Sequence, residues 1–276
     1  MGQHVRYVKP VAVQTARGQV AQVYAQMKRD LGIIPEPFTL HSPVPELLAG
    51  IWSIFRESLL AGRVRRGVKE AVAATVSESN RCPWCVDAHT IVLYATGERG
   101  AVEAIMHRHP DKRVDAHMQA IIRWAASTWM PGAPMIVHPP FAPQDAPEMI
   151  GTAVTFHYLN RMVSAVLSET FLPRFPWLKE SMKRMLGWAY AGSARTVYPP
   201  GSSLALLPEA ELPSDLSWAR ATPHIAAAFA RFAAVIERVG TRSLSQVVRD
   251  RVQEHIHRME CGGSWTQPPM GRASGK

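Results

Sequence analysis

Apolar and polar residues recur along most of this chain with the period of an α-helix. Between Gly18 and Gly32 the apolar residues follow helical spacing, and the closing glycine suits a helix C-cap. A longer apolar face runs from Pro45 to Gly62. Strand patterns are hard to find, so the sequence predicts an all-α fold. The predicted helices cover 18–32, 45–62, 64–79, 83–95, 102–107, 114–129 and 147–171, with two further alanine-rich helices in the last third.

The stretch 131–147 is rich in proline and lacks helical periodicity, which predicts an extended connector. The predicted organisation is a helical domain at 1–130, this connector, and a helical C-terminal region at 148–276. Within that region, the segment from Pro223 resembles the segment from Pro45 in its apolar positions. One hypothesis is a degenerate second helical repeat at the C-terminus. Chance similarity between alanine-rich helices is the other.

Candidate chemistry is concentrated in the segment EAVAATVSESNRCPWCVDAH, residues 70–89. Proline is at home in the first helical position, so a helix should begin with Cys82 at or near its N-cap. Cys85 then falls in the first turn. There the unpaired N–H groups and the helix dipole lower a thiol pKa from about 8.5 toward roughly 3.5 to 7.5. The pattern therefore predicts a thiolate at Cys85.

Helix geometry places the partners of this thiolate. Residues three apart in a helix have Cα atoms about 5 Å apart, within the roughly 4.4 to 6.8 Å that a disulfide tolerates, so Cys82 can bond to Cys85. His89 lies one turn beyond Cys85 on the same face and can accept or return a proton. The helix 64–79 should pack antiparallel to this one, with Glu70 better placed to address His89, directly or through water, than either cysteine.

The spacing Glu-x(11)-Cys-x(2)-Cys-x(3)-His resembles the signature of the alkylhydroperoxidase D (AhpD)-like branch of the carboxymuconolactone decarboxylase superfamily. The motif covers about twenty residues, and a looser resemblance extends over 37–131. It implies an all-helical, homo-oligomeric thiol peroxidase. In that family the second cysteine, here Cys85, attacks the peroxide, and the first, Cys82, resolves the sulfenic acid into a disulfide, while His89 and Glu70 assist proton transfer.

The resemblance also implies an external dithiol reductant, such as a dihydrolipoyl group or a lipoylated protein, and no bound cofactor or metal. One departure is Trp84, whose bulk between the cysteines alters access. A protein disulfide reductase or redox sensor using the same dithiol is the alternative function, and a non-catalytic scaffold with a vestigial site is a third. A zinc site lacks a well-placed fourth ligand, and a thioredoxin-like protein needs strands.

The composition and the net charge indicate the cellular compartment and the classes of partner to expect. The chain has 276 residues, 47% apolar and 19% charged, and its three cysteines do not make a disulfide framework. We therefore expect a reducing cytoplasm, with neither a signal peptide nor a membrane span. The net charge of +9 accompanies no nucleic-acid-binding motif. The densest basic cluster is either a solvated helix face or a surface that steers an acidic partner. It comprises Arg63, Arg65, Arg66 and Lys69.

Four histidines and one cysteine outside the motif also need an interpretation. His107, His109 and His117 suggest a metal site, but they lack a regular ligand frame, so surface or capping roles are favoured. His157 lies in an apolar helix and is either a hydrogen-bonded core residue or part of a substrate pocket. Cys261 is interpreted as a structural or incidental thiol.

Overall fold

The computed structural model describes residues 5–107, 114–130, 132–167, 171–173 and 175–260. Across these ranges the secondary structure is helical, and β-pairing is limited to two isolated bridges. The all-α prediction is confirmed. The helices are α1 (Gly18–Leu31), α2 (Glu36–Thr39), α3 (Pro45–Phe55), α4 (Arg66–Ser79), α5 (Pro83–Thr96), α6 (Arg99–His107), α7 (Ala116–Ser127), α8 (Pro134–Val137), α9 (Ala146–Val166), α10 (Pro176–Ala194), α11 (Pro223–Ser243) and α12 (Gln246–Glu260).

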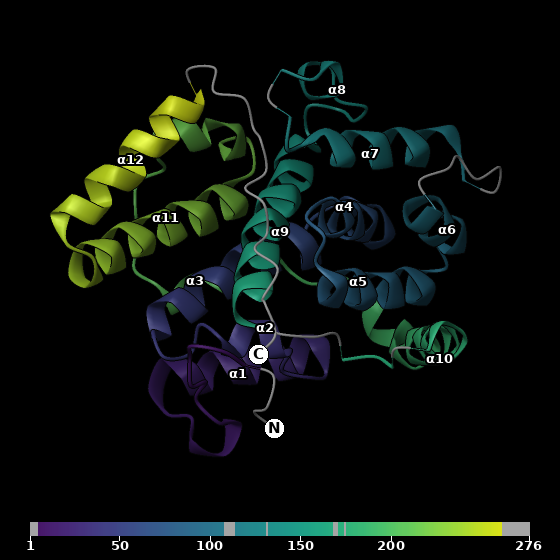
Figure 1. The fold of residues 1–276 in the computed structure, drawn as a ribbon, viewed down its shortest axis with the longest axis horizontal. Helices are drawn as coiled ribbons and strands as arrows, with labels where there is room; N and C mark the ends of the chain where they lie inside the picture. Colours follow the sequence, from purple (N-terminus) through teal and green to yellow (C-terminus); the bar gives the residue numbers. More distant parts are fainter. Residues whose placement is uncertain (1–4, 108–113, 131, 168–170, 174, 261–276) are drawn as a thin grey trace, which may run out of the picture. The chain divides into compact units, whose positions relative to one another are not determined.

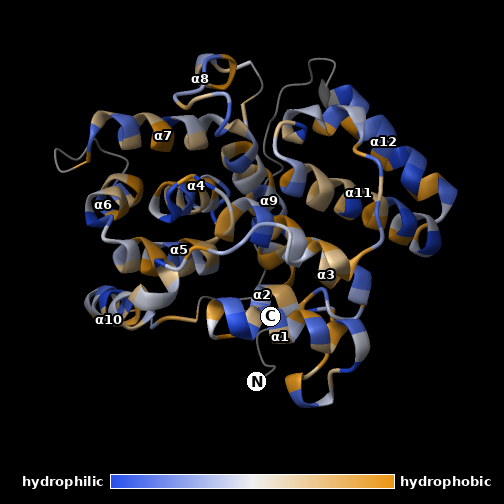
Figure 2. Cartoon of the chain, turned by 180° about the vertical axis from the view of Figure 1, so that it is seen from behind, coloured by the Kyte–Doolittle hydropathy of each residue, from blue (hydrophilic) through white to orange (hydrophobic). Residues whose placement is uncertain are grey.

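The chain divides into two compact units, residues 1–233 and 234–276. In the first unit, the proline-rich segment contains the four-residue helix α8, and helices from before and after this segment, α4 and α9, contact each other. In the second unit, α12 is predominantly hydrophilic (Figure 2). A degenerate repeat there stays a prediction, and Cys261 lies outside the described residues. Among the described helices, none combines the length and apolar character that a membrane span requires.

Several helix ends follow the sequence directly. Gly32 ends α1 in the left-handed conformation, with φ of 74°, as its C-cap role predicts. The helix expected from Pro45 to Gly62 changes type along its length: α3 ends at Phe55 and continues as a π-helical segment, 56–60. The buried, adjacent side chains of Arg56 and Glu57 pair with each other in this segment. Hydrophobic periodicity cannot anticipate such an inward-facing charged pair.

Helix α4 is the centre of the first unit (Figure 1). It is contacted by α5, α6, α7 and α9, and every residue from Gly67 to Ser77 is buried. Several of these residues are polar, including Lys69, Glu70 and Thr75. Buried polar groups need partners, so the position of α4 forces its polar side chains into specific contacts.

Helix α10 packs against α5, the helix that begins at the cysteines (Figure 1). Asp87 of α5 is 1% exposed and forms ion pairs with Lys179 at 2.8 Å and with Lys183 at 3.1 Å. The helices are in close contact at Gly187. A Cβ atom there would lie 2.7 Å from the Cβ of Tyr94 and 2.9 Å from a backbone oxygen of α5.

Replacing Gly187 with alanine is expected to lower the free energy of unfolding by roughly 1–3 kcal/mol, because the added methyl group overpacks this contact. Gly192 on the same helix provides the matched control, since no atom lies within 4 Å of its added Cβ. Alanine there should be neutral or stabilising by about 0.4–1 kcal/mol. Urea unfolding of both variants measures the difference. Equal stabilities would contradict the close packing of α10 on α5.

Candidate active site

The connection between α4 and α5 sets the position of Cys82. Asn80 caps the end of α4, and Arg81 adopts φ of 53°, a left-handed conformation that reverses the chain. Cys82 is the N-cap of α5 and Pro83 its first residue, as predicted. The backbone N–H of Cys82 donates to the carbonyl of Ser77 at 3.0 Å, which ties the cysteine back to α4.

The two cysteines form the disulfide that their spacing predicts. Their Cα atoms are 5.4 Å apart, and the bond joins the N-cap of α5 to its first turn. Cys82 is 1% exposed and Cys85 4% exposed. The sulfurs are therefore at the start of a helix, yet they lie beneath other side chains.

The cover over the disulfide comes from three parts of the chain. Val163 and Leu167, near the end of α9, pack in the same apolar cluster as the cysteines. Val5 and Val8 pack against this cluster, and Val5 forms an antiparallel bridge with Leu167. Trp84 joins from within the dithiol motif and contacts the ring of Phe171, with centroids 4.9 Å apart. Trp84 thus contributes to the cover, consistent with an effect on access.

Weakening the cover at its N-terminal segment should expose the dithiol. Replacing Val5 and Val8 together with serine removes apolar burial that favours the closed state, so alkylation of the reduced thiols should accelerate about tenfold. Tyr7 lies between them and is 89% exposed with φ of 66°; Tyr7→Asn, which tolerates this conformation, should leave the rate unchanged. Mass-spectrometric trapping with iodoacetamide measures both. Identical rates would mean that these residues do not limit access.

Glu70 and His89 are in direct contact, without the bridging water that the sequence left open. The Oε2 atom of Glu70 lies 2.6 Å from Nδ1 of His89. Glu70 is fully buried, and its other oxygen accepts a hydrogen bond from Nε of Arg66 at 2.6 Å. The ring of Phe156 meets the imidazole edge to face, with centroids 4.3 Å apart, and restricts its orientation.

The charge of Glu70 follows from these neighbours. Burial alone would raise the pKa of the Glu70 carboxyl, but the opposing charges and hydrogen bonds of Arg66 and His89 lower the pKa below its ordinary value. Glu70 is thus a carboxylate at neutral pH. It accepts the Nδ1 proton of His89, so Nε2 is the nitrogen left to act on a thiol or a leaving group.

The sequence did not identify Arg66 as a site residue. Within the basic cluster, Arg66 is largely buried against Glu70, and Lys69 is buried in an ion pair with Glu148 at 2.8 Å. A solvated face is therefore wrong for these two. Arg63 and Arg65 remain exposed, and each pairs with a carboxylate. The separation of four residues between Arg66 and Glu70 is the sequence feature that could have predicted this ion pair, because residues four apart are neighbours on a helix.

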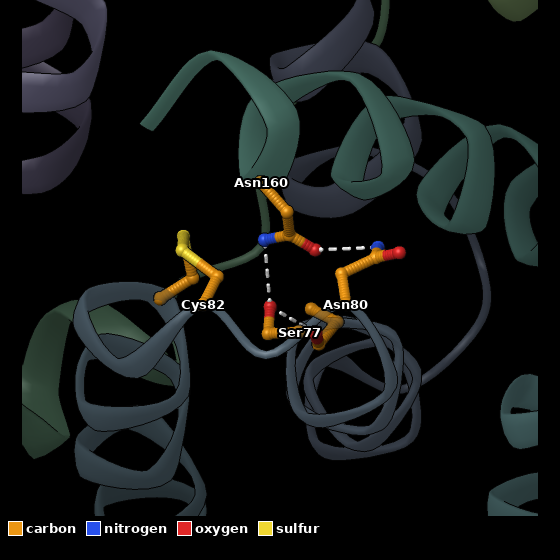
Figure 3. The surroundings of a disulfide bond; sticks show 6 residues. Ser77, Asn80, Cys82 and Asn160 are labelled. Carbon is orange, nitrogen blue, oxygen red and sulfur yellow. Dashed lines mark hydrogen bonds between the residues drawn. A yellow bond between two sulfur atoms is a disulfide. The ribbon is translucent and has the colours of Figure 1, made fainter. Parts of the chain in front are cut away.

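A polar network adjoins the disulfide (Figure 3). The buried side chain of Asn160, on α9, donates from Nδ2 to Oγ of Ser77 at 3.0 Å and accepts at Oδ1 from Asn80 at 3.1 Å. Asn80 also contacts Nδ1 of His157 at 3.1 Å, and Thr128 lies 2.8 Å from Nε2 of that ring. Burial first, and a nearby arginine second, lower the pKa of His157 to about 4. His157 is a neutral, hydrogen-bonded residue beside the turn.

The metal hypothesis gains no support from the described part of the chain, in which no group of three or more potential ligands gathers. His107 lies 3.3 Å from Glu103 on its own helix. His117 lines a pocket together with Arg63 and Asp145. His109 falls outside the described residues.

A relative of known description shows which family the chain belongs to. No protein-family model matches the chain. It is 41% identical over 270 residues to a protein of Mycobacterium tuberculosis strain H37Rv described as alkyl hydroperoxide reductase Rv2159c, covering 98% of this chain and 75% of that protein. The chain belongs to the AhpD-like alkylhydroperoxidase family. This confirms the family that the motif indicates.

The AhpD-like fold is also found in a solved structure. A crystal structure of the alkylhydroperoxidase AhpD core, an uncharacterized peroxidase-related protein from Ralstonia eutropha JMP134, matches with a TM-score of 0.52 at 14% identity. The match covers 66% of this chain and 95% of that one. At this identity the likeness shows the fold alone.

Proposed function

We propose that this AhpD-like protein is a thiol peroxidase that reduces alkyl hydroperoxides or hydrogen peroxide through the Cys82–Cys85 dithiol. The observation that carries the proposal is the direct Glu70–His89 hydrogen bond one helical turn from the disulfide. A nucleophile, a base and a group that orients the base form the arrangement by which enzymes activate thiols. The relative described as an alkyl hydroperoxide reductase supports the same chemistry.

The proposed cycle begins with the reduced dithiol. His89 takes the proton of the Cys85 thiol, the resulting thiolate attacks the distal peroxide oxygen as the O–O bond breaks, and His89 passes that proton to the departing alkoxide or hydroxide. Cys85 is now a sulfenic acid. Cys82 attacks this sulfur, water leaves, and the disulfide seen in the structure forms. Two electrons have passed from the dithiol to the peroxide.

The disulfide then needs two electrons from outside the protein. We propose an external dithiol, such as a dihydrolipoyl group or a lipoylated protein, acting in a reducing cytoplasm on a homo-oligomer of this chain. Because both sulfurs have low exposure, a slender dithiol reaches them more readily than a disulfide of a folded protein does. The same burial favours peroxide reduction over the alternative of a general protein disulfide reductase.

Thiol titration tests the proposal. The fully reduced chain is treated with one equivalent of peroxide, and its free thiols are counted before and afterwards. We expect the loss of two thiols, mapped by mass spectrometry to Cys82 and Cys85, while Cys261 stays reduced. Unchanged thiol content, together with efficient reduction of insulin disulfides by the dithiol, would favour the disulfide reductase. Unchanged content without either activity would favour a scaffold with a vestigial site.

A further inference from the structure

The amide side chain of Asn160 is buried beside Cys82 (Figure 3). Asn160 lies on α9 and is fully buried. Val163 and Leu167, three and seven residues further on, share its helical face and pack in the cluster that contains both cysteines. Figure 3 shows Asn160 between Cys82 and Asn80. The face of α9 that covers the sulfurs therefore also carries this amide.

The hydrogen-bond network fixes which end of the amide faces the sulfurs. A guanidinium group can only donate hydrogen bonds, so Nδ1 of His157, which lies 3.3 Å from Nη1 of Arg161, is an acceptor. Asn80 contacts the same nitrogen and must present its NH₂ group. That group also donates to Oδ1 of Asn160. The oxygen of Asn160 therefore faces Asn80, and its NH₂ group faces the opposite side.

The NH₂ group of Asn160 lies on the disulfide side of the network (Figure 3). The group has two hydrogens. Among the described residues, one of them is donated to Oγ of Ser77. Ser77 is also the residue whose carbonyl accepts from the backbone N–H of Cys82. The second hydrogen is left on the side of Cys82, the cysteine whose backbone is held by the same serine (Figure 3).

We propose that Asn160 is a positioning residue of the dithiol, whose NH₂ group stabilises the thiolate form of Cys82. This inference deepens the proposed function, on which it rests. When an external thiolate attacks Cys85, a new S–S bond forms and the Cys82–Cys85 bond breaks, leaving the electron pair on the Cys82 sulfur. A preorganised N–H donor favours that charge, because hydrogen bonds to ionised groups are stronger than those between neutral groups. The donor makes the disulfide easier to reduce.

Two substitutions separate this role from simple support of the turn. Asn160→Leu removes the donor, and the equilibrium constant for reduction by dithiothreitol at pH 8 should fall about tenfold, as for the loss of a hydrogen bond to a charged group. Asn160→Asp should lower it further, because it places a second negative charge beside the thiolate. If Asn160 only held the turn, the order would reverse, since an aspartate oxygen still accepts from Asn80, whereas leucine can accept no hydrogen bond.

The measurement uses the full chain, equilibrated with the dithiothreitol couple, quenched with acid and analysed by mass spectrometry. Thr128→Val, at the remote end of the network, is the control and should match the unmodified protein. Asn160→Ser repeats the test with a smaller side chain if the leucine variant does not fold. An aspartate variant within twofold of the unmodified protein, or less affected than the leucine or serine variant, would overturn the inference.

Peroxide turnover is measured separately, so the two ideas can fail separately. The predicted order of the Asn160 variants without any turnover would sustain the role of Asn160 and defeat the peroxidase. Turnover with the reversed order would do the opposite. A dithiol that neither forms the disulfide nor exchanges with dithiothreitol would defeat both.

Discussion

Replacing Cys85 with serine is expected to reduce kcat/KM for peroxide by ~10³-fold or more, as for the loss of an essential nucleophile in other enzymes. A serine hydroxyl ionises far less readily than a thiol, even in the first turn of α5, and is a poor nucleophile toward oxygen. The substitution exchanges one buried sulfur atom for a smaller oxygen atom and changes the side-chain volume little, so the fold should persist. Peroxide consumption with a dithiol reductant measures the loss.

The matched variant is Cys82→Ser, which keeps the attacking thiol and removes the resolving one. We expect one rapid equivalent of peroxide to be consumed, followed by accumulation of a sulfenic acid at Cys85 that dimedone traps and mass spectrometry locates. Steady-state turnover should be lost. The opposite outcome, a burst in Cys85→Ser and none in Cys82→Ser, would exchange the roles of the two cysteines.

Sequence reasoning succeeded where the chemistry is local. Cys82, Cys85 and His89 lie on one helix, whose start is marked by Pro83, so helical geometry alone predicts the disulfide and the shared face. Glu70 was predicted from the antiparallel hairpin, because a short connection restricts how two helices can align. The family motif then connected the pattern to a reaction.

The remainder depends on tertiary packing that periodicity does not contain. Arg66 is interpreted from sequence as part of a basic surface because it stands in a dense cluster of basic residues, yet the central position of α4 turns it inward to Glu70. Asn160 stands 83 residues from Ser77 in sequence, so no local pattern indicates their hydrogen bond. The burial of the sulfurs likewise depends on Val5 and Leu167, which lie at distant points of the chain.

Replacing Glu70 with glutamine should lower kcat/KM for peroxide by roughly 10²–10³-fold, within the range for loss of acid–base assistance. The variant keeps the size of the side chain but loses the charge that holds the Nδ1 proton of His89 and favours its protonated form during the reaction. Arg66 also loses its carboxylate partner. Rapid mixing with peroxide measures the rate, and dithiol exchange with dithiothreitol checks that the cysteines still function.

The pH dependence gives this prediction a second readout. The folded-state pKa of Glu70 lies below the ordinary value of 4.5, so its contribution to stability is present above that value and is lost as pH falls through the folded-state pKa. Glutamine should remove this acid dependence from urea unfolding. Because the charge of Arg66 helps to lower the pKa, Arg66→Gln should raise it and shift the loss of both activity and stability to higher pH. If Glu70→Gln retains the rate and both profiles, the hydrogen bond to His89 is structural, and the proton needed by the leaving oxygen must come from another group.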